Sequence, residues 1–410
     1  MRTLAHRLRI VSILVPLALL AACKSKPPPP EAPDYDRPLG PGERALRKVD
    51  DPSRVPLAAA YEARDDALGQ ALERSERWFL KPSTVQWFPT EEVTHEQAEA
   101  SVREARRLLD QGLPTAEFVA EFLRLFDVYE SVGYDRRGSV FFTGYYSAVF
   151  QGSRTRSDRY SAPLYRRPKD LVTDENTGEP RGRKLADGSL EPFPARSEIE
   201  SSRMLGGTEL VWLKDSLSAF IVHVNGSAKI ELDDGTAMYV GYHGKNGLPY
   251  TSLGQLMVDA GMIRADERGL AAIRREYARD PKAVEALMQR NESFVFFREA
   301  LEGDWPAGSL GFPVTEMTTL ATDKHIFPRA GLVLVDTRGL ARGGGRSDVL
   351  RFMADQDTGG AINAPGRADI FMGVGPAAEA LAGEQRSEGH LYYFFMKPEH
   401  IPPPAQPQTP

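Results

Sequence analysis

A single cysteine, Cys23, limits how this 410-residue chain can be held together. One cysteine can form no internal disulfide and no cysteine-based zinc site. Seven scattered histidines give no clear metal-binding pattern either. Hydrophobic residues make up 41% and charged residues 26%, which is ordinary for a globular protein, and the length suffices for two domains. We therefore expect a fold without a disulfide or a structural metal.

The N-terminus has the pattern of a secretion signal. Basic residues precede an apolar stretch at residues 10–20, which is too short to span a bilayer. The stretch ends in Leu20-Ala21-Ala22-Cys23, which resembles a bacterial lipobox, whose cysteine is acylated after cleavage of the signal. The alternative is an ordinary cleaved signal with a chance cysteine. Lys24 replaces the aspartate that retains lipoproteins at the inner membrane, so we expect an outer-membrane lipoprotein on the periplasmic face, anchored through Cys23.

Charge and hydropathy exclude some partners. The formal net charge of −6 gives no basic field, which argues against nucleic acid as a partner. After the signal, no segment has eighteen uninterrupted apolar residues, so no further membrane span is expected. Proline-rich stretches predict an extended tether over residues 24–55 and a tail over residues 398–410.

The first part of the folded region has helical periodicity. Apolar residues recur at helical spacing over residues 57–79. Thr94 and Gln97 form a predicted capping box at the start of a second helical segment. After a break at Gly112 and Pro114, apolar residues predict one face of a third helix, namely Phe118, Phe122, Leu125, Phe126 and Tyr129.

Strand patterns dominate from Ser139 onward, with short helices between them. We expect an exposed loop at 173–189, a strand pair or bend at 219–230 around Asn225-Gly226, and a hairpin turn at Asp234-Gly235. Helices are predicted at 251–262, 267–278 and 281–289. Further strands are predicted at 294–297, 318–322, 332–336, 350–354, 368–371 and 391–396. The pattern indicates a mainly β protein with peripheral helices.

Three aspartates are the candidates for chemistry, because no Gly-x-Ser-x-Gly, Walker loop or His-Glu-x-x-His motif is present. Asp323 follows a predicted strand, Asp357 precedes two glycines, and Asp369 lies inside an apolar strand. A strand carboxyl is unfavourable when desolvated unless it is paired or protonated, and a raised pKa for acid catalysis is one explanation. A structural role in capping turns is the other, and the pattern alone does not decide between them.

Several motifs, in order from about residue 140 to 396, resemble the membrane-bound lytic transglycosylase A family and its 3D domain, named after three aspartates. The segment 355–375 is similar to the 3D signature. The other matching segments are Phe142-Thr143-Gly144-Tyr145-Tyr146, Tyr165-Arg166, Ala195-Arg196-Ser197-Glu198-Ile199, Gly241-Tyr242-His243-Gly244-Lys245-Asn246-Gly247 and 291–297. Departures occur at Asn225, Ala228, Asn363-Ala364 and Met372, where the family usually has Gln, Gly, Lys-Gly and an aromatic residue.

The resemblance implies a double-psi β-barrel, the 3D domain, with a second, smaller β-domain inserted in the chain. The catalytic barrel with its N-terminal helices would comprise residues 56–147 and 298–397, and the inserted domain residues 148–297. A groove between them would hold the glycan.

The resemblance also implies cleavage of the β-1,4 bond between N-acetylmuramic acid and N-acetylglucosamine in peptidoglycan, with 1,6-anhydro-N-acetylmuramic acid ends. Asp369 would be the catalytic acid and base, with Asp357 and Asp323 supporting it. The expected glycan-binding residues are Thr143, Tyr145, Tyr146, Lys245 and Asn246. No metal or cofactor is required, and other cell-wall enzymes are candidate partners. The rival hypotheses are an endoglucanase-like hydrolase and a non-catalytic peptidoglycan-binding lipoprotein.

Overall fold

The structure, a computed structural model, describes residues 33–175, 177–340, 346–360 and 362–402. The chain divides after Pro33 into two units, and all of the described secondary structure belongs to the second, Asp34–Pro410. The predicted signal peptide, Cys23 and most of the C-terminal tail lie outside the described residues. Among the described helices, none combines the length and apolar character that a bilayer span requires.

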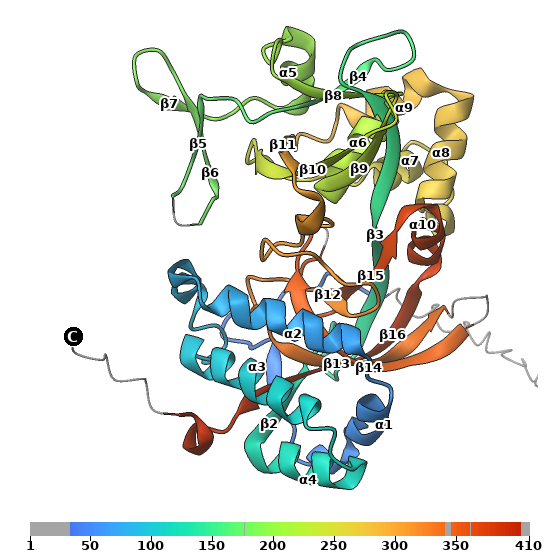
Figure 1. The fold of residues 1–410 in the computed structure, drawn as a ribbon. Helices are drawn as coiled ribbons and strands as arrows, with labels where there is room; N and C mark the ends of the chain where they lie inside the picture. The colour runs from blue at the N-terminus through green and yellow to red at the C-terminus, as the bar shows by residue number, and fades with distance from the viewer. Residues whose placement is uncertain (1–32, 176, 341–345, 361, 403–410) are drawn as a thin grey trace, which may run out of the picture. The chain divides into compact units, whose positions relative to one another are not determined.

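Six strands pair in a closed ring (Figure 1). Its members are β3 (Val140–Ser153), β12 (Thr319–Ala321), β13 (Leu332–Leu340), β14 (Arg346–Asp357), β15 (Arg367–Val374) and β16 (Arg386–Met396). The order is β16-β13-β14-β12-β15-β3, and β3 pairs with β16 again. The pairs β12–β14 and β15–β3 are parallel and the others are antiparallel. These strands confirm the predicted strand segments in the C-terminal part of the chain.

Strand β3 continues beyond the ring into a second group of strands. Its first half pairs with β15 and β16, whereas Ala148–Gly152 pairs in parallel with β9. The second group contains β4 (Ala162–Tyr165), β8 (Glu209–Leu213), β9 (Ser227–Leu232), β10 (Ala237–Lys245) and β11 (Val295–Ala300). The predicted hairpin turn at Asp234-Gly235 joins β9 to β10, and Gly235 has the positive φ of 84° that such a turn favours.

A small separate sheet occupies the segment predicted as a loop at 173–189. It consists of β5 (Leu171–Thr173), β6 (Pro180–Lys184) and β7 (Leu190–Glu191), all antiparallel. The prediction of an exposed segment is correct for most of its described residues, but the prediction of a loop without strands is wrong. The sequence did not indicate these strands because the segment is rich in charged residues and glycines, which are depleted in strands.

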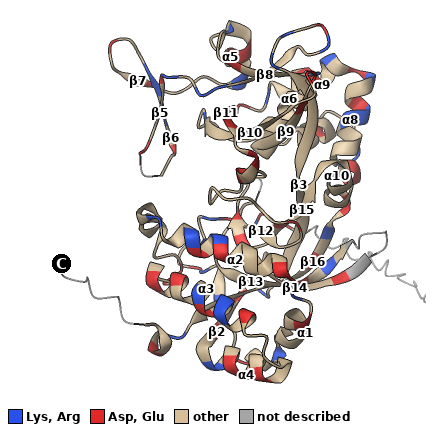
Figure 2. Cartoon of the chain, in the orientation of Figure 1, with Lys and Arg blue, Asp and Glu red and all other residues tan. Residues whose placement is uncertain are grey.

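The N-terminal helices pack against the ring (Figure 1). They are α1 (Leu57–Glu62), α2 (Asp66–Phe79), α3 (His95–Asp110) and α4 (Thr115–Leu125). Helices α1 and α2 contact β14, and α3 contacts β16, around one large hydrophobic core. Acidic and basic side chains are interspersed along α3 and α4 and form local ion pairs (Figure 2). Such exposed pairs contribute little stability, so the buried apolar faces hold these helices in place.

Two details of this region differ from the sequence predictions. Thr94 accepts a hydrogen bond from the backbone N–H of Gln97 at 3.1 Å, as expected, but the Gln97 amide donates to the carbonyl of Met396 instead of closing the capping box. The predicted third helix ends at Leu125, and Phe126–Ser131 forms strand β2. Strand β2 pairs with β16 and with β1 (Leu46–Lys48), which lies within the predicted tether. This pairing overrides the helical spacing of the apolar side chains.

The remaining helices surround the second group of strands. They are α5 (Arg196–Ser202), α6 (Ser216–Asn225), α7 (Leu253–Asp259), α8 (Leu270–Arg279) and α9 (Pro281–Met288), while α10 (Gly375–Glu384) packs on β3 and β15. The described residues also contain five short 3-10 helices, namely Pro52–Arg54, Pro82–Trp87, Ala265–Glu267, Glu302–Asp304 and Pro398–His400.

The prediction of a strand pair or bend at 219–230 is wrong for its first half, which is helical, and is confirmed for the strand that follows Gly226. Residues up to Asn225 form α6, Gly226 ends the helix with a φ of 72°, and β9 begins at Ser227. The side chains from Leu217 to His223 are all buried, so α6 lacks the polar face that reveals a helix in a sequence. Predictions for α7, α8 and α9 are confirmed, including Pro281 in the first turn of α9.

Candidate active site

Asp369 and Thr143 meet on neighbouring strands of the ring. They are direct partners in the parallel register of β15 and β3, and the Thr143 hydroxyl donates a hydrogen bond to Oδ1 of Asp369. The guanidinium of Arg367, also on β15, lies 3.9 Å from the same oxygen. The Asp369 side chain is 17% exposed, so a substrate atom can reach a carboxyl that is otherwise enclosed.

The environment of Asp369 favours its protonated form. Burial raises the pKa of the Asp369 carboxyl above its usual 3.8, although the charge of Arg367 and the hydrogen bond from Thr143 partly oppose the rise. A carboxyl with a raised pKa retains its proton to higher pH and can donate it to a leaving oxygen. The contacts of Arg367 and Thr143 favour the ionised form of the same carboxyl.

Asp357 lies at the end of β14 and is tied to its surroundings through both oxygens. The Tyr145 hydroxyl donates to Oδ2 at 2.8 Å, and the backbone N–H groups of Ser309 and Thr358 donate to Oδ1 at 2.9 Å each. Burial raises the pKa of Asp357, while these three donors and the charge of Lys324 lower it. Because both of its oxygens accept hydrogen bonds, Asp357 links Tyr145 to the backbone at Ser309 and Thr358.

Asp323, the third predicted acid, accepts hydrogen bonds from backbone N–H groups. It lies just after β12, separated from the strand by Thr322. Its Oδ1 accepts from the N–H of His325 while Oδ2 accepts from the N–H of Ala364, both at 3.0 Å. Ala364 has a φ of 72°, a left-handed conformation that costs an alanine free energy. Asp323 therefore fixes a strained turn that leads toward β15 and Asp369.

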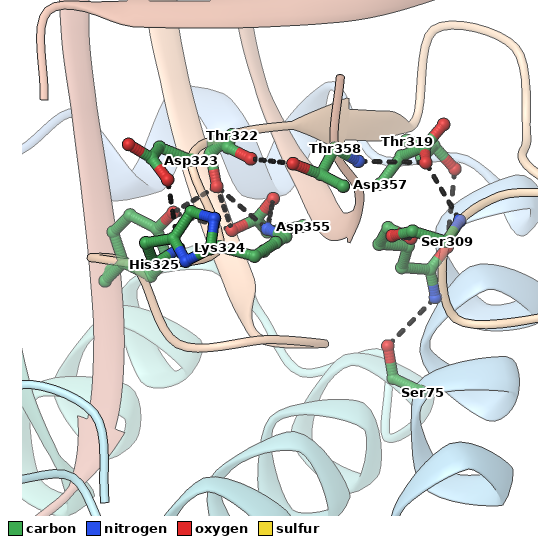
Figure 3. Close-up of polar contacts among 12 residues, drawn as sticks. Ser75, Ser309, Thr319, Thr322, Asp323, Lys324, His325, Asp355, Asp357 and Thr358 are labelled. Carbon is green, nitrogen blue, oxygen red and sulfur yellow. Dashed lines mark hydrogen bonds and ion pairs between the residues drawn. The ribbon is translucent and has the colours of Figure 1, made fainter. Parts of the chain in front are cut away.

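A buried ion pair next to these acids was missed by the sequence predictions. Lys324 contacts Asp355, and their side chains are 2% and 0% exposed. The hydroxyls of Thr322 and Tyr393 donate to Oδ2 of Asp355 at 2.8 and 2.7 Å, and Lys324 donates to Thr322 at 2.8 Å. Figure 3 shows Thr322, Lys324 and Asp355 pointing toward one another. Asp355 could have been found, because it is a strand acid like Asp369, but nothing in the sequence distinguishes Lys324 from a surface lysine.

The predicted glycan-binding residues separate into two groups. Thr143 and Tyr145 adjoin the acids, through their hydrogen bonds to Asp369 and Asp357. Tyr146 instead faces α10, is 9% exposed, and donates to Glu379 at 2.8 Å. Tyr145 thus contacts Asp357, whereas the next residue, Tyr146, packs against α10.

Lys245 and Asn246 lie at the end of β10, outside the ring. The Lys245 side chain is 40% exposed and approaches Glu179 of the small sheet at 3.9 Å. Asn246 is 3% exposed and donates to the carbonyls of Pro194 and Glu292 at 2.9 Å each, while its oxygen accepts from the N–H groups of Leu248 and Phe294. All of the hydrogen-bonding capacity of the Asn246 amide is therefore used to join backbone segments.

Within the residues that the structure describes, no group of three or more histidine, cysteine, aspartate or glutamate side chains is arranged to hold a metal ion. The site presents one partly accessible carboxyl with a raised pKa, with a cation and a hydroxyl beside it.

Comparison with known proteins places the chain in a family. Residues 141–298 match the MltA specific insert domain, and residues 318–395 match the 3D domain. The membrane-bound lytic murein transglycosylase A of Escherichia coli K12 is 31% identical over 280 residues, which cover 66% of this chain and 70% of the relative. The chain belongs to the membrane-bound lytic murein transglycosylase A family. This confirms the family resemblance found in the sequence motifs.

Solved structures of the family share the fold. A membrane-bound lytic murein transglycosylase from Agrobacterium tumefaciens matches with a TM-score of 0.69 at 24% identity, covering 86% of this chain and 98% of that chain. The E. coli MltA with bound chitohexaose matches with a TM-score of 0.63 at 24% identity, covering 90% and 98%. The transglycosylase A family fold is thus a mixed, sheet-dominated structure with a 3D domain, an insert domain and peripheral helices.

Proposed function

We propose that this chain is a lytic transglycosylase that cleaves the β-1,4 bond between N-acetylmuramic acid and N-acetylglucosamine in peptidoglycan. The observation that carries the proposal is the partly exposed carboxyl of Asp369, whose pKa is raised by burial, on a strand of the 3D domain. The names of the curated relatives, which are lytic murein transglycosylases, support murein as the substrate. The chitohexaose bound to the E. coli relative supports recognition of a β-1,4-linked glycan.

In the proposed reaction Asp369 acts twice. Protonated Asp369 donates its proton to the oxygen that joins the muramic acid to the glucosamine, and the bond from C1 to that oxygen breaks. The resulting carboxylate accepts the proton of the C6 hydroxyl of the muramoyl residue as that oxygen attacks C1. The product is a 1,6-anhydro ring, no water is consumed, and Asp369 ends in its starting protonation state. Arg367 and Thr143 stabilise the carboxylate between the two steps.

The contacts of Asp357 support this route over ordinary hydrolysis. A hydrolytic glycosidase needs two carboxyl groups on either side of the bond, one of which activates water or attacks C1. Asp357 already accepts hydrogen bonds from Tyr145, Ser309 and Thr358, so it is poorly suited to take a proton from water. We propose instead that Asp357 and Asp323 hold Tyr145 and the turn at Ala364 in place around Asp369.

For glycan binding we propose Thr143, Tyr145 and Lys245. The first two adjoin the acids, and Lys245 offers an exposed cation to a carboxylate of the substrate. The internal contacts of Tyr146 and Asn246 support a structural role for both, with an indirect effect on the glycan. A glycan groove between the ring and the insert domain is part of this proposal.

We further propose the finer assignments of fold and location. The closed ring of six strands with mixed pairing supports a double-psi β-barrel over 56–147 and 298–397, interrupted by the inserted domain at 148–297. The lipobox-like segment and the membrane-bound relatives support an outer-membrane lipoprotein that is anchored through Cys23 and faces the periplasm, with other cell-wall enzymes as candidate partners.

Mass spectrometry of the sugars released from purified sacculi tests the proposal. We expect products that end in 1,6-anhydro-muramic acid and are lighter by one water than reducing-end products. Reducing ends would mean that water attacks C1, as in the hydrolase hypothesis. Binding to sacculi without released sugars would indicate a non-catalytic wall-binding protein.

A further inference from the structure

A cavity lies entirely within the insert domain. Its volume is about 490 Å³, which is within the range of small-molecule and peptide sites. All of its lining residues fall between Ser161 and Phe294, and none belongs to the six strands of the ring. The cavity is therefore lined by residues other than those around Asp369, and the proposed cleavage reaction does not use it.

Buried aromatic and apolar side chains form part of the cavity lining. Phe220, Met288 and Phe294 are buried, and the guanidinium of Arg196 lies 5.0 and 5.1 Å from the rings of Phe220 and Phe294. Arg196 donates to two backbone carbonyls and to Glu200 at 3.2 Å. Its charge is thus compensated internally, and Arg196 belongs to the framework of the cavity.

His223 contributes a hydrogen-bond donor to this lining. It is 7% exposed, and its Nδ1 accepts from the backbone N–H of Val295 at 3.1 Å. Burial, together with the nearby charge of Arg196, lowers the pKa of His223 well below 6.5. The ring is therefore neutral and carries its hydrogen on Nε2. No hydrogen bond of Nε2 to another described residue is present, and His223 lines the cavity, so this donor is available to a molecule bound there.

The rim of the cavity carries charges that the protein leaves unpaired. Glu285 accepts hydrogen bonds from the hydroxyls of Ser216 and Tyr277, and Asp215 accepts from the N–H of Ser218, but neither acid forms an ion pair in the described part of the chain. Burial raises the pKa of the Tyr277 hydroxyl, and the charges of Asp215 and Glu285 add to the rise. Lys214, exposed on the same rim, has no carboxylate partner among the described residues either.

We propose that this cavity binds a short peptide that carries both an ammonium and a carboxylate group, namely the peptide stem attached to the glycan. The ammonium of a diamino acid lies against Asp215 and Glu285, a peptide carbonyl accepts from Nε2 of His223, and a carboxylate faces Lys214. Each charged group thereby gains a partner of opposite charge, and the donor of His223 gains an acceptor. The inference rests on the proposed function, because peptidoglycan is the substrate that brings such a peptide to the enzyme.

Calorimetric titration of the full chain in detergent tests the peptide site directly. The probe is the tripeptide L-Ala-γ-D-Glu-L-Lys, and the matched control is the same peptide with its lysine amine acetylated. We expect the tripeptide to bind, and acetylation to weaken binding tenfold or more. Equal affinity for both peptides, or no binding of the tripeptide, would overturn the proposal, and equally tight binding of free L-lysine would overturn its assignment to a peptide.

Charge-removing variants assign the binding to this cavity. Glu285→Gln and Asp215→Asn keep the shape and the hydrogen-bond acceptors of the side chains, so the fold is preserved. Each is expected to weaken tripeptide binding tenfold or more. Glu231→Gln, at an exposed position of β9 outside the cavity, is expected to leave binding unchanged. Equal loss in all three variants, or in none, would contradict the site.

Cleavage assays separate this inference from the proposed function. Both cavity variants should cleave peptide-free glycan strands like the parent protein, but should have a raised KM for strands that carry peptides, with kcat unchanged. Cleavage of both substrates by the parent with no peptide binding would refute the peptide site and leave the transglycosylase proposal intact. Peptide binding without cleavage of either substrate would refute the proposed reaction instead.

Discussion

The hydroxyl of Tyr145 on β3 donates a 2.8 Å hydrogen bond to Oδ2 of Asp357 at the end of β14, although β12 and β15 lie between these two strands in the ring. Burial raises the pKa of Tyr145 well above 10, and the charges of Asp357 and Asp369 add to the effect. Tyr145 therefore stays neutral and acts as a hydrogen-bond donor to Asp357.

Tyr145→Phe should lower both stability and activity. A hydrogen bond to a carboxylate contributes about 1.5–3 kcal/mol, so we expect a loss of that order in the free energy of unfolding, measured in urea. Without the donor, the pKa of Asp357 should rise further. Tyr146→Phe is the matched control, because it removes the hydroxyl that donates to Glu379. It should lower stability while leaving cleavage nearly intact. Equal loss of cleavage in both variants would argue against a specific role for Tyr145.

Asp369→Asn should abolish cleavage, because an amide can neither donate nor accept the transferred proton. General acid–base catalysis contributes about 10²–10⁴-fold, and we expect a loss of at least that size in the release of sugars from sacculi. Asp348→Asn, at an exposed position of β14, should retain full activity. Substantial cleavage by Asp369→Asn with a native circular dichroism spectrum would refute the assignment of the acid.

The pH dependence of stability should identify the same carboxyl. The pKa of Asp369 is raised in the folded state, so its contribution to stability is present at low pH and is lost as pH rises through the folded pKa. Asp369→Asn removes this ionisation. The variant should match the parent protein below pH 3.8 and become progressively more stable than the parent above it, as measured by urea unfolding across pH. A difference that is constant with pH, or of opposite sign, would contradict the raised pKa.

Cleavage should follow the same ionisation. Because the first step needs protonated Asp369, cleavage by the parent protein should decline as pH rises through the raised pKa. A rate that increases steadily through this range would indicate that the carboxylate is the form required at the start.

Breaking the buried ion pair should be more harmful than removing it. Lys324→Met leaves Asp355 uncompensated in the core, which costs about 3–5 kcal/mol. The double variant with Asp355→Leu should recover part of this loss, since it buries no charge. Both can be compared by urea unfolding. Additive losses would mean that the two residues act independently and would contradict a direct pair.

Cys23→Ala should release the protein into the soluble periplasmic fraction if the lipid anchor is attached there. Lys24→Asp is the informative companion, because it leaves the anchor but should shift the protein to the inner membrane. Fractionation and immunoblotting measure both. Retention of Cys23→Ala in the outer membrane would argue against the lipobox.

Sequence periodicity predicts most of the elements around the ring, because their apolar faces alternate with polar ones. It fails for α6, whose side chains are all buried from Leu217 to His223, and at Phe126, where pairing with β16 overrides helical spacing. The ring itself arises from contacts between distant segments, such as β3 with β15, and no local pattern encodes them.

The acids were predictable as unusual strand residues, whereas their division of roles depends on partners that only the fold brings together. No pattern near Asp357 in the sequence predicts its hydrogen bond from Tyr145, and none near Asp355 predicts its hydrogen bond from Tyr393. Asn246 was expected to bind the glycan, yet its amide donates to the carbonyls of Pro194 and Glu292.

Strand β3 belongs to the ring through its first half and to the insert domain through its second half. The two regions thus hold a stretch of backbone in common, and neither can be excised without cutting the other. A cut in the chain within β3 would leave both sheets incomplete, each with an open edge. The insert domain therefore shares strand β3 with the ring, and a substitution in β3 is expected to affect both sheets.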